Sequence, residues 1–98
     1  FLSAFSAVKD NLVSTIVNHT TAGDEIVICN AALTVTLNDE PKDRELVKVK
    51  IANGDVVING NGKDIDNDTD ITIVFLNLQG LAVIDVIYTI ETDSWWVL

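Results

Sequence analysis

The sequence predicts an all-β fold: a compact antiparallel sandwich or barrel-like domain of about eight short strands, with a short N-terminal helix or arm. Two observations favour this class. The chain is 48% hydrophobic with one Pro and no Met, and β-branched Val, Ile and Thr, the residues that suit strands, crowd it. From Leu12 onward the apolar side chains recur at every second residue, the period of a strand with one face toward a core. At 98 residues the chain is long enough for one domain and too short for two.

The first residues follow a longer period. Four apolar side chains share one helical or heptad-like stripe, namely Phe1, Phe5, Val8 and Leu12. Such a stripe is too short for a coiled coil. It therefore predicts an arm or stem over 1–11 and a β domain over 12–98, and a frayed terminus is the alternative that the spacing leaves open.

Short connections join the predicted strands. The strands cover residues 12–18, 25–30, 32–38, 46–52, 55–59, 71–78, 81–90 and 94–98. Because two-residue loops can join antiparallel neighbours but not parallel ones, we expect consecutive strands to pair antiparallel. We detect no linker and no internal repeat.

Asparagine and glycine mark the expected turns. Asn53-Gly54 lies between two alternating apolar runs and predicts a type I′ hairpin, in which both central residues adopt positive φ. A valine at position 54 should therefore damage the turn. Asn-Gly recurs just afterwards at Gly60 and Gly62, and Gly80 separates two long strands.

Several predicted strands are apolar on both faces. Residues 26–29 contain only Ile, Val and Cys, and residues 71–84 contain no charge. Within the latter run, Val74 and Leu76 face away from the side that Phe75 occupies. Strands left exposed in this way would aggregate. We therefore expect burial between subunits, with a central strand inside one sandwich as the alternative.

Charge and cysteine content exclude several partners. Fifteen acidic residues against six basic ones give a formal net charge of −9, whereas a nucleic-acid surface needs clustered Lys and Arg. No apolar run approaches the roughly 20 residues of a membrane helix, so neither nucleic acid nor membrane is an expected partner. The lone Cys29 cannot form an internal disulfide, and its apolar neighbours indicate a core residue.

No pattern indicates catalysis or a cofactor. His19 is the only histidine, nothing in the spacing places it beside a nucleophile, and no glycine-rich phosphate loop precedes a helix. We expect a protein without enzymatic activity, catalytic residues or cofactor.

One acidic segment invites a metal hypothesis. Aspartates alternate from Asp64 to Asp70, but the positions that need Gly and Glu in a calcium-binding loop hold Thr69 and Phe75. The segment predicts a solvated turn with no metal ligand, and a looser calcium site is the alternative.

The two adjacent tryptophans should point to opposite faces of the last strand. One of Trp95 and Trp96 is expected in the core. The other, which we assign as Trp96, would contact a subunit or, alternatively, form a platform for a sugar ring.

A series of segments stands in a familiar order: Leu33-Thr-Val-Thr-Leu37, Val47-Lys-Val-Lys-Ile51, Gly60-Asn-Gly62-Lys-Asp-Ile65-Asp66, Thr69-Asp-Ile-Thr-Ile73 and Asp93-Ser-Trp-Trp-Val-Leu98. Over about residues 12 to 98 this order resembles the small β modules of tailed-phage virion proteins: tail fibres and tailspikes, head fibres and capsid decoration proteins. The sequence departs from their pattern at Asn38, which replaces a Pro, at Trp96, which replaces a Tyr, and at Asn67, which replaces a Gly. Asn67 could preserve the turn because Asn tolerates positive φ.

The resemblance implies a structural protein of the virion, assembled in the host cytoplasm, that forms a homotrimer and binds capsid or tail subunits. A carbohydrate- or receptor-binding module that grips a host-surface glycan is the alternative. The residues expected to contact another copy or partner are Phe1, Phe5, Val8, Leu12, Val74, Leu76 and Trp96.

Overall fold

The computed structural model describes residues 11–67, 70–73 and 82–98. Within these ranges the chain forms nine strands: β1 (Leu12–Thr15), β2 (His19–Thr20), β3 (Glu25–Cys29), β4 (Leu33–Thr36), β5 (Leu46–Ile51), β6 (Val56–Asn59), β7 (Asp70–Ile73), β8 (Ala82–Thr89) and β9 (Ser94–Val97). The described residues contain no helix, and hence none that could span a membrane. The all-β class is confirmed, whereas the expected arm lies outside the described residues apart from Asn11.

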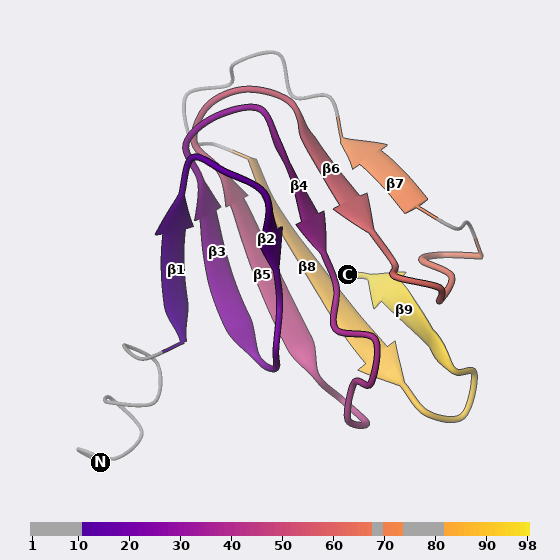
Figure 1. The fold of residues 1–98 in the computed structure, drawn as a ribbon. Coiled ribbons are helices and arrows are strands. Elements are labelled where there is room, and N and C mark those ends of the chain that lie inside the picture. Colours follow the sequence, from indigo (N-terminus) through magenta and orange to yellow (C-terminus); the bar gives the residue numbers. More distant parts are fainter. Residues whose placement is uncertain (1–10, 68–69, 74–81) are drawn as a thin grey trace.

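The strands form two sheets that enclose one core (Figure 1). The five-stranded sheet has the order β1-β3-β5-β8-β9, and the four-stranded sheet has the order β2-β4-β6-β7. From β1 to β6 the chain alternates strictly between the two sheets, so that β1–β2, β3–β4 and β5–β6 stack like successive turns of a coil.

The prediction of antiparallel pairing was wrong for the first six strands. β1, β3 and β5 run parallel, as do β2, β4 and β6. In the described ranges, antiparallel pairs occur only where β7 joins β6, β8 joins β5 and β9 joins β8. Parallel neighbours need a long crossover. Here each crossover is itself a strand of the opposite sheet, which is why short loops suffice.

Asn53-Gly54 is consequently not a hairpin turn. It joins β5 to β6, which lie in different sheets. Gly54 has a φ of 82°, as a turn glycine should, but Asn53 does not adopt positive φ. A Cβ on Gly54 would overlap the backbone nitrogen of Ala32, so this connection also requires glycine for a close approach of two backbones.

Alternate residues of both sheets fill the core. Among the described residues, the largest fully buried side chain is Trp95 of β9. The other buried apolar side chains are Val27, Cys29, Leu33, Val35, Leu37, Val47, Val49, Ile51, Val56, Ile58, Ile65, Val86 and Tyr88. Burying a side chain of Val, Leu or Ile size contributes about 1.5–3 kcal/mol. Burial also raises the pKa of the Cys29 thiol to about 11, which keeps this side chain neutral and apolar at ordinary pH.

Candidate interaction surface

The outer face of the five-stranded sheet carries an unusual share of apolar side chains. Leu12, Leu46 and Val83 are exposed there, at 48%, 36% and 44% of their surface. The pairing registers place half-buried side chains beside them: Ile26, Ile28, Ile87 and Trp96. We call this outer surface the apolar face, because the sheet is apolar on its solvent side as well as on its core side.

Charged side chains interrupt the apolar face at its centre. Lys48 and Asp85 are direct cross-strand partners in β5 and β8, and Lys48 Nζ lies 3.7 Å from Asp85 Oδ2. Asp85 Oδ1 is buried without a hydrogen-bond partner. Lys50, two residues along β5, shares the face. The strands of this face thus contribute two lysines and one aspartate, whereas the whole chain has a net charge of −9.

The opposite outer face, on the four-stranded sheet, is polar. Thr20, Thr36 and Asn59 are neighbours across β2, β4 and β6, and Thr34 pairs with Val57. Threonine hydroxyls and an amide suit a surface that faces water. Among the strand side chains that the structure describes, the exposed apolar ones lie on the five-stranded sheet, so the two outer faces differ in chemistry.

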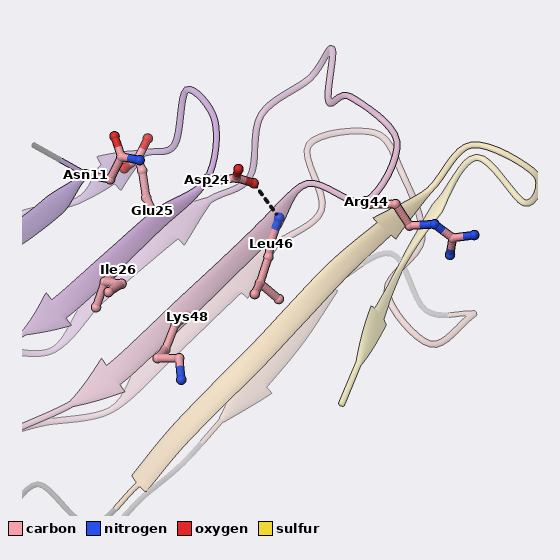
Figure 2. A pocket seen from close by; sticks show the side chains of 7 residues that line it. All are labelled: Asn11, Asp24, Glu25, Ile26, Arg44, Leu46 and Lys48. Atoms are coloured by element: carbon pink, nitrogen blue, oxygen red, sulfur yellow. Dashed lines mark hydrogen bonds between the residues drawn. The ribbon is translucent and has the colours of Figure 1, made fainter. Parts of the chain in front are cut away.

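A groove of about 410 Å³ opens on the apolar face (Figure 2). It lies where the parallel strands β1, β3 and β5 begin. The groove is lined by the side chains of Ile26 on β3 and of Leu46 and Lys48 on β5. Polar or charged residues form its margin. The marginal residues are Asn11, Asp24, Glu25 and Arg44.

Two hydrogen bonds hold the margin of the groove in place. The Leu46 backbone N–H donates to Asp24 Oδ1 at 2.8 Å, which ties the start of β5 to the loop before β3. Glu25 Oε1 lies 2.7 Å from His19 Nε2. In the described part of the chain His19 therefore meets a carboxylate rather than a hydroxyl or thiol nucleophile.

The structure places some of the expected contact residues on the apolar face. Leu12 lies on it at the edge strand β1, and Trp96 lies on it beside Ile87. The indole N–H of Trp96 donates to the hydroxyls of Thr89 and Thr92, at 3.1 and 3.2 Å. The remaining expected contacts lie outside the described residues: Phe1, Phe5, Val8, Val74 and Leu76.

The expected turn residues occupy loops. Gly60, Asn61 and Gly62 form a type I′ turn, because Asn61 and Gly62 have φ of 55° and 89° and the Lys63 N–H donates to the Gly60 carbonyl. Asn67 has a φ of 72°. Gly80 lies outside the described residues.

The acidic segment supports the last strand. Trp95 N–H donates to the Asp64 carbonyl at 2.8 Å, and Asp66 N–H donates to the Trp95 carbonyl at 3.0 Å. Asp66 Oδ1 then accepts a bond from the Val97 N–H at 2.9 Å. Among the described residues no group of three or more His, Cys, Asp or Glu side chains could hold a metal ion.

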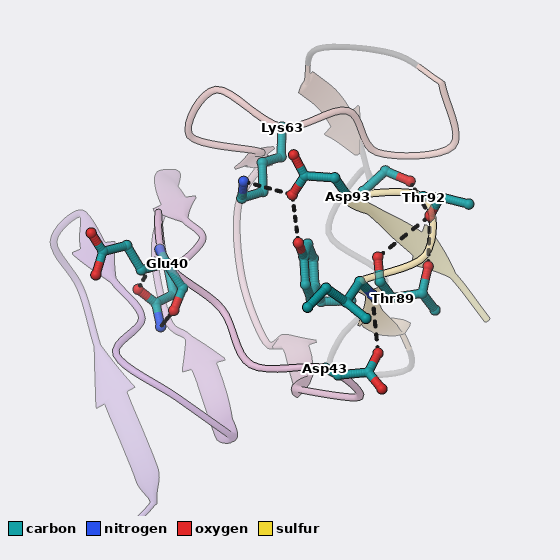
Figure 3. Close-up of polar contacts among 10 residues, drawn as sticks. Glu40, Asp43, Lys63, Thr89, Thr92 and Asp93 are labelled. Carbon is teal, nitrogen blue, oxygen red and sulfur yellow. Dashed lines mark hydrogen bonds and ion pairs between the residues drawn. The ribbon is translucent and has the colours of Figure 1, made fainter.

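A second polar cluster joins the loop after β6 to the turn between β8 and β9 (Figure 3). Asp93 Oδ1 accepts hydrogen bonds from Lys63 Nζ at 2.8 Å and from the Tyr88 hydroxyl at 2.5 Å. The bond from Lys63, followed by that from Tyr88, lowers the pKa of Asp93. The bond to Asp93 raises the pKa of Tyr88 to about 12. The cluster fastens two loops to each other.

Comparisons with known proteins leave the chain without an assigned family. No protein-family model matches it, and no curated protein matches it. Its function must therefore be inferred from its own surface, above all from the apolar face and its groove.

Proposed function

We propose that this protein is a structural component of a phage virion, a homotrimeric capsid decoration or fibre module that attaches to and stabilises the particle. One observation carries the proposal: the outer face of the five-stranded sheet exposes Leu12, Leu46 and Val83 and contains a groove. An apolar face of this kind marks a protein–protein contact in a stable domain. The order of segments in the sequence supports the virion as its setting.

The charge distribution favours contact through this face. Copies with a net charge of −9 repel one another over most of their surface. The apolar face holds Lys48, Lys50 and Asp85, and its groove adds Asp24, Glu25 and Arg44. Because the two signs balance, copies that meet there do not juxtapose large like charges. The polar face of the four-stranded sheet would then face solvent.

The test is the mass of the full chain in solution. Sedimentation equilibrium over a wide range of concentrations should give a trimer. Val83→Lys, at an exposed position directly opposite Lys50, should weaken the trimer at least tenfold, because burying a charge beside a like charge costs several kcal/mol. Thr34→Lys, on the polar face, is the matched control and should leave the mass unchanged. A wild-type chain that remains monomeric would overturn the proposal.

Trp96 favours a second candidate, a carbohydrate-binding module. Its indole N–H is already bound by Thr89 and Thr92, so the ring is held rigidly on the outer face. A fixed aromatic face is suited to stacking against a sugar. Tryptophan fluorescence across a panel of glycans should change in the wild type and not in Trp96→Ala. An unchanged wild-type signal would remove this candidate.

A further inference from the structure

The most exposed pair of neighbouring apolar side chains in the described residues lies at one end of the five-stranded sheet. Ile16 and Val17 follow β1 directly and are 69% and 65% exposed. They lie on the connection between β1 and β2, at the top of Figure 1. We refer to residues 16–18 as the apolar loop.

Hydrogen bonds fix the apolar loop in shape. Thr15 Oγ1 accepts a bond from the Val17 N–H at 3.0 Å and donates to the Val17 carbonyl at 2.9 Å. Asn18 Oδ1 accepts a bond from the Thr34 N–H at 2.8 Å, which anchors the loop to β4. The two aliphatic side chains are thus displayed on a preorganised support, which lowers the entropy lost when they bind a partner.

The groove lies at the other end of the same strands. It is formed where β1, β3 and β5 begin, whereas the apolar loop follows the end of β1. A volume of about 410 Å³ falls within the range of about 300–1,000 Å³ that holds small-molecule-sized groups. Ile26 and Leu46 supply apolar surface on its inside.

The charges of the two surfaces allow them to meet. The apolar loop carries no charged residue, and the residues that line the groove carry both signs, with Asp24 and Glu25 negative and Arg44 and Lys48 positive. An uncharged loop can therefore enter without repulsion, although the two copies each carry a net charge of −9.

We infer that the apolar loop of one copy docks into the groove of a second copy. The inference rests on the proposed self-association and specifies its geometry. Because the loop and the groove are different surfaces, the contact is heterologous, and each copy uses its loop on one neighbour and its groove on the other. Repetition of this contact gives a closed ring such as a trimer when the rotation between copies closes, and an open filament when it does not.

Complementation between two defective variants tests the inference. Ile16→Asp/Val17→Asp damages the loop and leaves the groove intact, and Leu46→Arg damages the groove and leaves the loop intact. Each variant of the full chain alone should sediment as a monomer. An equimolar mixture should form a dimer and nothing larger, because only one intact loop and one intact groove can meet.

A matched control distinguishes this contact from general loss of apolar surface. Ile90→Asp removes an aliphatic side chain that is 62% exposed on the turn between β8 and β9, and it should retain the wild-type mass. Circular dichroism should show all variants folded, since the substituted side chains are exposed.

Three outcomes would overturn the inference. If the wild type is oligomeric and the loop variant keeps its mass, the geometry is wrong while the proposed self-association stands. If the wild type is monomeric, both fail. If the wild type co-sediments with phosphatidylcholine vesicles and the loop variant loses that ability instead, the loop serves a membrane rather than a second copy.

Discussion

At the scale of single residues, three glycines distinguish the two costs of adding a Cβ, namely backbone strain at positive φ and steric overlap with a neighbouring atom. Gly23 has neither positive φ nor any atom within 4 Å of the place that a Cβ would take. Gly62 has positive φ in open space, and Gly54 has positive φ together with a backbone neighbour that its Cβ would overlap. The three positions therefore add one cost at a time.

An alanine series should follow that order. We expect Gly23→Ala to change the free energy of unfolding by less than about 1 kcal/mol and Gly62→Ala to lower it by about 1–2 kcal/mol. Gly54→Ala should lower it by about 3 kcal/mol or more, because steric overlap adds to the backbone strain. Urea denaturation measures all three. Equal effects at Gly54 and Gly62 would mean that the close approach to Ala32 is absent.

The cluster of Tyr88, Asp93 and Lys63 predicts how stability depends on pH. The pKa of Asp93 is lower in the folded chain, so its contribution is present above the unfolded pKa of about 3.9 and is lost as pH falls through the folded value. The pKa of Tyr88 is raised to about 12. Its contribution is complete below the unfolded value of about 10 and is lost as pH rises through about 12.

Asp93→Asn isolates this effect. Asp93 has a φ of 50°, which Asn tolerates equally well, so the turn should persist while the charge disappears. The tyrosinate absorbance should then appear at lower pH than in the wild type. An Asp43→Asn variant is the control: it removes a nearby exposed carboxylate that contributes less to the Tyr88 pKa. A tyrosine titration that is unchanged in Asp93→Asn would show that Asp93 does not raise the pKa of Tyr88.

At the scale of elements, the two edges of the five-stranded sheet differ. The outer edge of β9 is covered by residues 64–66, which exchange backbone hydrogen bonds with Trp95. Among the described strands β1 pairs only with β3, and β1 contains no charge or proline, the devices that usually protect an edge strand. The covered edge belongs to β9, and the edge formed by β1 lies beside the apolar loop.

Substitutions at Asp66 measure how strongly residues 64–66 are held against the edge of β9. Its φ is 50°, so Asp66→Gly keeps the backbone shape and removes only the carboxylate that binds the Val97 N–H. We expect a loss of about 0.5–1.5 kcal/mol in the free energy of unfolding, and Asp66→Asn, which retains an acceptor oxygen, should lose less. Faster hydrogen exchange at the Val97 amide in Asp66→Gly alone would locate the effect. Equal exchange in both variants would show that the carboxylate does not hold the edge.

The positions of the elements were largely predictable, and their pairing was not. Alternating apolar residues marked most strands to within a few residues, but β2, with two residues, was too short to show a period. The registers pair Leu12 with Ile26 and Ile26 with Lys48. Because the paired residues lie at unequal distances along the chain, a search for sequence repeats does not detect the stacked arrangement. The short loops led instead to a prediction of hairpins.

The candidate surface was predictable only in part. Two-sided apolar strands indicated a face such as the one that carries Leu12 and Trp96. The groove escaped prediction because it is assembled from residues near the starts of β1, β3 and β5, which become neighbours only through parallel pairing. Ile16 and Val17 were expected to continue a strand, and nothing in their spacing indicated an exposed loop.

At the scale of the whole molecule, the net charge predicts how association responds to salt. Raising the ionic strength from about 0.01 M to about 0.15 M shortens the Debye length from about 30 Å to about 8 Å. Screening should weaken the repulsion between copies with a net charge of −9 and leave apolar contacts intact. The fraction of oligomer measured by sedimentation should therefore rise. A fall would indicate that ion pairs, rather than the apolar face, hold the copies together.

The alternation of the chain between two sheets also bears on how fast the protein folds. β1 cannot pair until β3 has been reached, and the central strand β5 gains its second neighbour only when β8 arrives, with Leu46 opposite Ile87. Contacts so distant along the chain must close large loops before they return any stabilisation, and topologies dominated by them fold in milliseconds to seconds. During synthesis β5 leaves the ribosome before β8, so β5 would wait with an unpaired edge. A slow, single-exponential refolding phase that depends on the presence of residues 82–98 is the kinetic counterpart of this architecture.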